Sequence, residues 1–152
     1  MSDFDDPRLT ASGLLMEAHD GLLRKLLPGM AEIGLSPPDF NALIRLARSP
    51  GGRLRMSDLA AQTALSTSGI TRVVDRLQRA DLIHRESRSD DRRSTYAVIT
   101  AEGRARLAEF LPGHLESLDR WLTGLLTPEQ LEALLEGLRI VRDEVFPEAT
   151  SR

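Results

Sequence analysis

The sequence contains no cysteine, and only 4% of its residues are aromatic. Without cysteine, disulfide bonds, zinc–thiolate sites and thiol redox chemistry are excluded. The three histidines, His19, His84 and His114, are scattered, and none forms a metal-spaced pair with another ligand. The sequence also lacks a nucleophile motif and a glycine-rich loop of the kind that binds phosphate. We therefore expect no cofactor, no metal and no enzymatic activity.

Long hydrophobic runs are absent as well. No apolar segment approaches the roughly 20 residues that a transmembrane helix requires. The acidic start, MSDFDDPRLT, lacks the basic-then-apolar order of a signal peptide. We therefore expect a cytoplasmic protein without membrane association. At 152 residues and 41% hydrophobic content, the chain suffices for one domain, or for one small domain with helical extensions.

The net charge is −3, but the charges are unevenly distributed along the chain. Residues 51–100 contain nine arginines and six acidic residues and carry a net charge of +3, whereas the remainder carries −6. A basic middle region is compatible with binding to a polyanion, although many solvated surfaces show the same pattern.

Apolar residues recur at three- and four-residue spacing near both ends of the chain, which predicts amphipathic helices. The first spans about residues 5–27 and is expected to stop at Pro28, and the last follows a Thr127 cap. Their apolar stripes are wider than one helix face, because they include adjacent pairs such as Leu14–Leu15, Leu22–Leu23, Leu134–Leu135 and Ile140–Val141. We predict that these helices dimerise two copies of the chain; packing within one chain is the alternative.

Another helix follows a cap at Thr100 and carries Leu107 and Phe110. Pro112 is expected to kink or break it, because proline cannot donate to the helical ladder. His114 follows this break, and we expect it at the surface.

The middle of the chain predicts a helix that starts after Ser36 and ends at a turn over residues 49–52. Ser57 is expected to cap a short helix over residues 58–63, and Ser66 a longer one that reaches about residue 79. Two helices separated by a tight turn are typical of a helix-turn-helix.

The spacing then changes, and residues 82–86 and 95–99 predict two strands joined by a polar loop over residues 87–94. The expected fold is mainly α: a winged helix-turn-helix, with a two-stranded β wing, and N- and C-terminal dimerisation helices. We divide the chain into an N-terminal dimerisation helix (1–34), a winged DNA-binding lobe (35–100, "the winged lobe") and C-terminal dimerisation helices (101–152).

The second helix of the helix-turn-helix opens with short hydroxyl side chains and one long arginine. A helix in the major groove reads DNA with its first turns, where hydroxyls approach phosphates and an arginine reaches a guanine edge. Ser66, Ser68, Thr71 and Arg72 supply this set. Helix capping alone would also explain the individual serines and threonines.

The polar loop and its base contain four arginines within nine residues, Arg85, Arg88, Arg92 and Arg93. The minor groove is narrow and strongly negative, and an arginine on a thin β ribbon is shaped to enter it. Asp91 is near enough in sequence to hold one guanidinium in place. An ordinary solvated turn is the alternative.

The segment from Leu35 to Thr100 resembles the MarR family of bacterial regulators. The resemblance lies in LAAQTALSTSGITRVVDRLQRADLIHR and in SDDRRSTYAVITAEG, with helices before and after in the family's order. It implies a homodimer of winged helix-turn-helix protomers that regulates transcription by binding a palindromic operator in double-stranded DNA. A winged helix that serves as a protein-interaction module is the alternative, and it leaves the arginine-rich loop unexplained.

The resemblance also implies roles for individual residues. Ser66, Ser68, Thr71 and Arg72 would face the major groove, and Arg93 would enter the minor groove with Asp91 orienting it and Arg92 beside it. Thr67, Arg76 and Arg88 complete the predicted DNA-binding set. The family often has an acidic residue where this loop has Arg88.

Finally, the resemblance implies a small aromatic or phenolic effector, bound between the helical scaffold and the winged lobe, that weakens DNA binding. The candidate ligand-binding residues are His19, Leu23, Asn41, Arg45 and Trp121, because they lie on elements expected to meet there. Arg45 would pair with an anion and Trp121 would offer a stacking face. Alternatively, Arg45 is plain surface and Trp121 plain core.

Overall fold

The computed structural model describes residues 3–88 and 91–150, with the backbone alone at residues 3, 88 and 91–93. Its helices are α1 (Pro7–Glu32), α2 (Pro37–Arg48), α3 (Met56–Gln62), α4 (Thr67–Arg79), α5 (Ala101–Trp121) and α6 (Pro128–Val145). Its strands are β1 (Arg53–Arg55), β2 (Ile83–Arg88) and β3 (Asp91–Ile99). Four short 3₁₀ helices complete it: η1 (Asp3–Asp5), η2 (Pro50–Gly52), η3 (Thr123–Leu125) and η4 (Pro147–Thr150).

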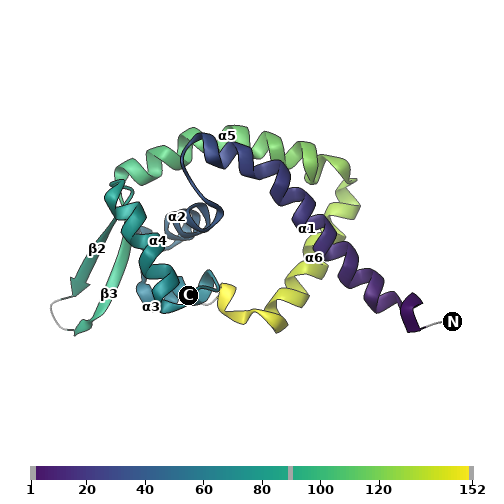
Figure 1. The fold of residues 1–152 in the computed structure, drawn as a ribbon, viewed down its shortest axis with the longest axis horizontal. Coiled ribbons are helices and arrows are strands. Elements are labelled where there is room, and N and C mark those ends of the chain that lie inside the picture. Colours follow the sequence, from purple (N-terminus) through teal and green to yellow (C-terminus); the bar gives the residue numbers. More distant parts are fainter. Residues whose placement is uncertain (1–2, 89–90, 151–152) are drawn as a thin grey trace.

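The elements form a curved scaffold with the winged lobe below one end (Figure 1). Helices α1 and α5 lie side by side, and α2, α3, α4 and the strands gather beneath the start of α5 (Figure 1). From the far end of α5, α6 turns back and brings η4 into contact with α3. The mainly α winged helix-turn-helix fold predicted from the sequence is confirmed.

The starts of the helices are fixed by local hydrogen bonds. Ser66 Oγ accepts from the Gly69 amide at 3.0 Å, and Thr100 Oγ1 accepts from the Gly103 amide at 2.9 Å. The Thr127 and Ser36 side chains take part in capping boxes, so both unpaired backbone donors are satisfied reciprocally. The predicted caps at Ser66, Thr100 and Thr127 are therefore confirmed.

Three expectations about the helices are wrong. Helix α1 does not stop at Pro28 but continues to Glu32. Its packing on α5 offsets the local cost of proline, because Gly29 lies against the Phe110 ring and Met30 is buried. Similarly, α5 continues through Pro112, so the break that was one of the two expectations there does not occur, and the Pro112 side chain is exposed to solvent. Helix α3 begins at Met56, so Ser57 lies inside it and is not its cap.

His114 is buried, contrary to the expectation that it lies at the surface. Because α5 continues through Pro112, His114 stays on the same inward face as Phe110. Its ring stacks on Phe110 at a centroid distance of 4.8 Å and contacts Phe40 of α2 at 5.0 Å. Burial lowers the pKa of the His114 imidazole.

The sheet has the order β1–β3–β2, and both pairings are antiparallel. Strands β2 and β3 form the wing, with Ile83 opposite Ile99 and Ser87 opposite Thr95, and the register shifts after Ser87. Strand β1, which the sequence did not predict, pairs Arg55 with Tyr96. Three residues are too few to show a strand periodicity.

The core lies inside the winged lobe. Side chains from α2, α3, α4, β2 and the turn before β2 are essentially inaccessible to solvent: Leu43, Leu46, Leu59, Ile70, Val74, Leu77, Leu82 and Ile83. Leu107 of α5 joins this cluster. The start of α5 packs directly against the lobe, since a Cβ at Gly103 would overlap the Leu82 carbonyl oxygen. Among the described residues, no helix is both long enough and apolar enough to cross a membrane.

Candidate nucleic-acid interface

Helix α4 presents one face to the core and the other to solvent. Ile70, Val73, Val74 and Leu77 are buried, whereas Ser66, Thr67, Ser68 and Arg72 are exposed. The spacing of the apolar residues fixes this orientation, because positions three and four apart share one helix face. The first turns of α4 are therefore held by the core and offered to an external partner.

The exposed end of α4 carries hydroxyl and amide groups of the kind that can bind phosphate. Ser66 Oγ lies 3.1 Å from Ser68 Oγ and also caps the helix. A helix N-terminus has unpaired amide groups and a partial positive charge, both of which attract anions. The Thr71 side chain is partly buried, and its hydroxyl donates to the Thr67 carbonyl at 2.8 Å. Because the one hydroxyl proton is used in this bond, the Thr71 oxygen can only accept a further hydrogen bond.

Arg72 projects from the exposed face one turn into α4. None of the residues that the structure describes forms a hydrogen bond or an ion pair with the Arg72 guanidinium. An unengaged guanidinium has five donors in a planar fork, which match the acceptors of guanine or phosphate. Its position agrees with the base-reading role that the resemblance implies.

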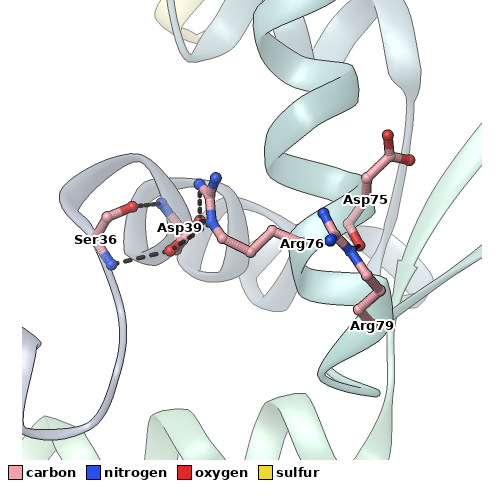
Figure 2. Close-up of polar contacts among 5 residues, drawn as sticks. All are labelled: Ser36, Asp39, Asp75, Arg76 and Arg79. Atoms are coloured by element: carbon pink, nitrogen blue, oxygen red, sulfur yellow. Dashed lines mark hydrogen bonds and ion pairs between the residues drawn. The ribbon is translucent and has the colours of Figure 1, made fainter.

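Arg76, by contrast, is held by the protein. Figure 2 shows its side chain pointing toward Asp39 of α2. Its Nε donates to both carboxylate oxygens at 3.0 and 3.2 Å, and Asp39 also accepts from the Ser36 amide at 3.0 Å. The carboxylate raises the pKa of the Arg76 guanidinium. A contact between Arg76 and DNA would have to share or replace this ion pair.

A second ion pair attaches the wing to α4. Arg85 of β2 donates to Asp75 Oδ1 at 2.7 Å and to Gln78 Oε1 at 2.7 Å. Arg79, on the next turn, donates to the Asp75 carbonyl at 3.2 Å (Figure 2). Sequence reasoning counted Arg85 among the loop arginines, but its guanidinium fixes the angle between the wing and α4.

Sequence reasoning missed the positioning residues Asp39, Asp75 and Gln78. Asp75 and Gln78 are three residues apart in the sequence, which is the spacing of one helix face. That spacing could have indicated a shared partner. Asp39 had no such signal, because its partner is 37 residues away in the sequence.

The other predicted wing residues are Arg88, Asp91, Arg92 and Arg93. Their backbone forms the end of β2 and the start of β3, with Arg88 opposite Asp91. The structure describes only the backbone of these four residues and not their side chains. Their roles therefore stay predictions.

The structure brings together only part of the predicted effector site. The Arg45 Nε donates to Asn41 Oδ1 at 3.0 Å, and both residues line a cavity of about 900 Å³. His19 lies near Asp20 on the exposed surface of α1, and Trp121 is partly exposed beneath Lys25. His19, Leu23 and Trp121 do not line this cavity.

The fold and the exposed α4 together define a class of protein, the winged helix-turn-helix DNA-binding proteins. Within that class, the family model described as "MarR family" matches residues 33–94. The repressor YetL of Bacillus subtilis is 30% identical over 72% of this chain and 70% of its own length. The repressor MprA of Escherichia coli is 28% identical over 98% of this chain and 89% of its own.

Solved structures agree. Sco3205 of Streptomyces coelicolor, a MarR family regulator crystallised with DNA, is 30% identical with a TM-score of 0.83 over 90% of this chain and 86% of that one. AbsC, from the same organism, is 31% identical with a TM-score of 0.84 over 95% of this chain and 96% of that one. The chain belongs to the MarR family and is a DNA-binding transcriptional regulator.

Proposed function

We propose that the chain is a homodimeric repressor that binds an inverted-repeat operator with α4 in the major groove. The observation that carries this proposal is the exposed first half of α4, where Ser66, Ser68 and the unengaged Arg72 face solvent. The DNA complex of Sco3205 supports it, as do the names of the relatives YetL and MprA. Because such a regulator acts on the chromosome, a cytoplasmic location is part of this proposal.

The homodimer rests on apolar surface that one chain leaves open. Helix α6 is fully described and has no buried residue. Its exposed apolar side chains are Leu134, Leu135, Leu138, Ile140, Val141 and Val145, and those of α1 are Leu9, Leu14, Leu15, Met16 and Leu27. Large apolar side chains that stay exposed in such number indicate an interaction site. The predicted boundaries at residues 34 and 100 then separate the dimerisation helices from the winged lobe.

In the proposed complex, Thr67 joins the serines at phosphates. Thr71, whose hydroxyl donates to the Thr67 carbonyl, accepts from a base edge, and Arg72 reads another base edge. Arg93 enters the minor groove with Asp91 orienting it, and Arg92 and Arg88 lie near the phosphates of the wing contact. Arg76 positions α4 through Asp39 and reaches DNA only if that ion pair opens. An aromatic or phenolic effector that weakens DNA binding is part of the same proposal.

The test is binding of the purified protein to duplexes selected from a random pool. A two-fold dimer predicts selected sites with two inverted half-sites about one helical turn, roughly 10 bp, apart. Affinity should fall steeply with salt concentration, because phosphate contacts release counterions. Binding without sequence preference or salt dependence would favour the protein-interaction module instead.

Two variants separate the roles of helix and wing. Arg72→Ala should weaken operator binding by about 1–3 kcal/mol and relax preference at one base pair. Arg93→Ala should weaken binding to many sequences alike and lower the salt slope by about 1. Arg24→Ala, an exposed arginine of α1 with the same charge change, is the control. Wild-type affinity in Arg93→Ala would contradict the wing assignment.

A further inference from the structure

A cavity of about 430 Å³ lies between α4 and the wing, and we call it the wing hollow. Figure 1 shows the place, since the wing projects from the lobe next to α4. Five elements supply the polar lining of the hollow: Arg55 of β1, Ser57 of α3, Thr71 of α4, Arg85 of β2, and Ser94 and Thr95 of β3. Of these residues, only Thr71 belongs to the DNA-binding set predicted from the sequence.

The charged side chains of the wing hollow are cationic. Among the described residues that line it there is no aspartate or glutamate. The charge of Arg85 is offset by Asp75 at 2.7 Å. Arg55 is exposed, its Nε donates to the Tyr96 hydroxyl at 3.1 Å, and its guanidinium lies 5.8 Å from the centre of that ring. Because Tyr96 is neutral, this contact holds Arg55 in place without cancelling its positive charge.

Two hydroxyl groups of the wing hollow have a proton to donate. No residue that the structure describes forms a hydrogen bond with the side chain of Ser57 or Thr95. Ser57 is exposed on α3, and Thr95 is half-buried on β3. The Thr71 hydroxyl differs, because its proton is used at the Thr67 carbonyl. A phosphodiester only accepts hydrogen bonds, so Ser57 and Thr95 can donate to it and Thr71 cannot.

The position of the wing hollow matches a feature of DNA itself. Adjacent grooves of a duplex are separated by one sugar–phosphate strand. The proposed function places α4 in the major groove and the wing in the neighbouring minor groove, so this strand has to pass between the two elements. The wing hollow is the space between them, and its volume exceeds that of a phosphate ion. It therefore suits a continuous strand better than a free ion.

We propose that the wing hollow binds one phosphodiester of the strand that separates the two grooves. Ser57 donates to the phosphate oxygens from α3 and Thr95 from β3, and Arg55 supplies the positive charge. The inference rests on the proposed function, because α4 and the wing enclose a strand only if both enter the DNA. A contact of this kind fixes the position of the duplex on the protein and carries no sequence information of its own.

The experiment replaces single phosphates of the selected operator by neutral methylphosphonates and measures the affinity of the full-length protein by fluorescence anisotropy. In each half-site, one linkage between the α4 contact and the wing contact should weaken wild-type binding by about tenfold, because charge-assisted hydrogen bonds are lost. Ser57→Ala and Thr95→Val should each weaken binding to the unmodified operator by about tenfold. In both variants, the methylphosphonate at that linkage should then have little further effect.

A second arm measures the charge of Arg55 and needs no operator. Arg55→Gln should lower the slope of log affinity against log salt concentration by about 1 for each chain bound, on duplexes of random sequence as well. Arg53→Gln is the matched control. Arg53 belongs to the same strand and lies 5.5 Å from the centre of the Tyr96 ring, but it does not line the wing hollow. Its substitution should leave the slope unchanged.

Arg55 and Ser57 are exposed, so their substitutions leave the fold intact even if Thr95→Val is destabilising. Methylphosphonates that weaken binding equally at every linkage would overturn the proposal. So would wild-type operator affinity in both Ser57→Ala and Arg55→Gln. An equal loss of slope in Arg53→Gln would assign the effect to the general positive field of the sheet and reject a defined phosphate site.

The two arms keep this proposal and the proposed function apart. If the random pool yields no operator, a slope that falls in Arg55→Gln but not in Arg53→Gln supports the phosphate site and rejects sequence reading by α4. Specific operator binding that is unchanged in Arg55→Gln, Ser57→Ala and Thr95→Val retains the proposed function and rejects the phosphate site.

Discussion

The winged lobe and the terminal helices use their apolar side chains in different ways. In the lobe, Leu43, Leu46 and Ile70 are buried by neighbours from the same chain. In α1 and α6, side chains of the same kind remain open, and Ile140 and Val145 are 66% and 74% exposed. Amphipathic patterning is therefore common to both regions, but only the lobe completes its own core.

The difference assigns each region a separate task. A complete core holds the exposed face of α4 in a fixed position, which sequence reading by a helix requires. In the proposed homodimer, the open faces of α1 and α6 would contact a second copy and so set the spacing of two α4 helices on DNA. The stability of α1 and α6 should therefore depend on protein concentration, whereas the stability of the winged lobe should not.

The largest expected effect is in the core of the winged lobe. Leu46→Ala should lower the free energy of unfolding by about 3 kcal/mol, because it opens a cavity where the side chain has no exposure. Urea unfolding followed by circular dichroism measures it. The loss should be the same at low and high protein concentration. A loss that disappears at high concentration would contradict a self-contained lobe.

A charge on the open face of α6 should act on association instead. Leu138→Asp should weaken dimerisation by about 100-fold, about 3 kcal/mol, since the change is repeated in both copies of an apolar interface. Sedimentation velocity measures the dissociation constant, with Glu136→Gln on the same helix as the control. Wild-type association in Leu138→Asp would place the interface elsewhere.

A smaller effect is expected at the ion pair that joins α2 to α4. The Arg76 side chain is 49% exposed while that of Asp39 is 3% exposed, so Arg76→Gln leaves a buried carboxylate without its cation. We expect a loss of about 1–2 kcal/mol, reduced by solvent screening at the exposed partner. The double variant Asp39→Asn/Arg76→Gln should recover part of it. Unfolding in urea that matches wild type would show that the pair does not hold α4.

The smallest effect is a pH dependence at His114, where α5 meets the lobe. Burial lowers the pKa of the imidazole in the folded state, so the unfolded state binds the proton more readily as pH falls below about 6.5. Stability should therefore fall as pH is lowered through this range. His114→Phe keeps the aromatic contact and should reduce the slope, whereas His19→Gln at an exposed site should not. An unchanged slope in His114→Phe would assign the dependence to another group.

Local chemistry made much of the fold predictable. Ser66, Thr100 and Thr127 cap the helices that the sequence predicted, because a cap needs only a hydroxyl and an amide three residues away. The apolar spacing of α4 also fixed which face is exposed. The candidate DNA-contacting residues at the start of α4 could therefore be named without a structure. The ion pairs that hold Arg76 to Asp39 and Arg85 to Asp75 could not.

The class of fold, the order of helices and wing, and the family follow from the sequence alone. Three features depend on tertiary packing: α1 and α5 continue through Pro28 and Pro112, His114 is buried, and β1 completes the sheet. It also brought Arg45 to Ala149, 104 residues away in the sequence. Capping and periodicity act within a few residues, but the packing that offsets a proline and the charge of a cavity depend on distant segments of the chain.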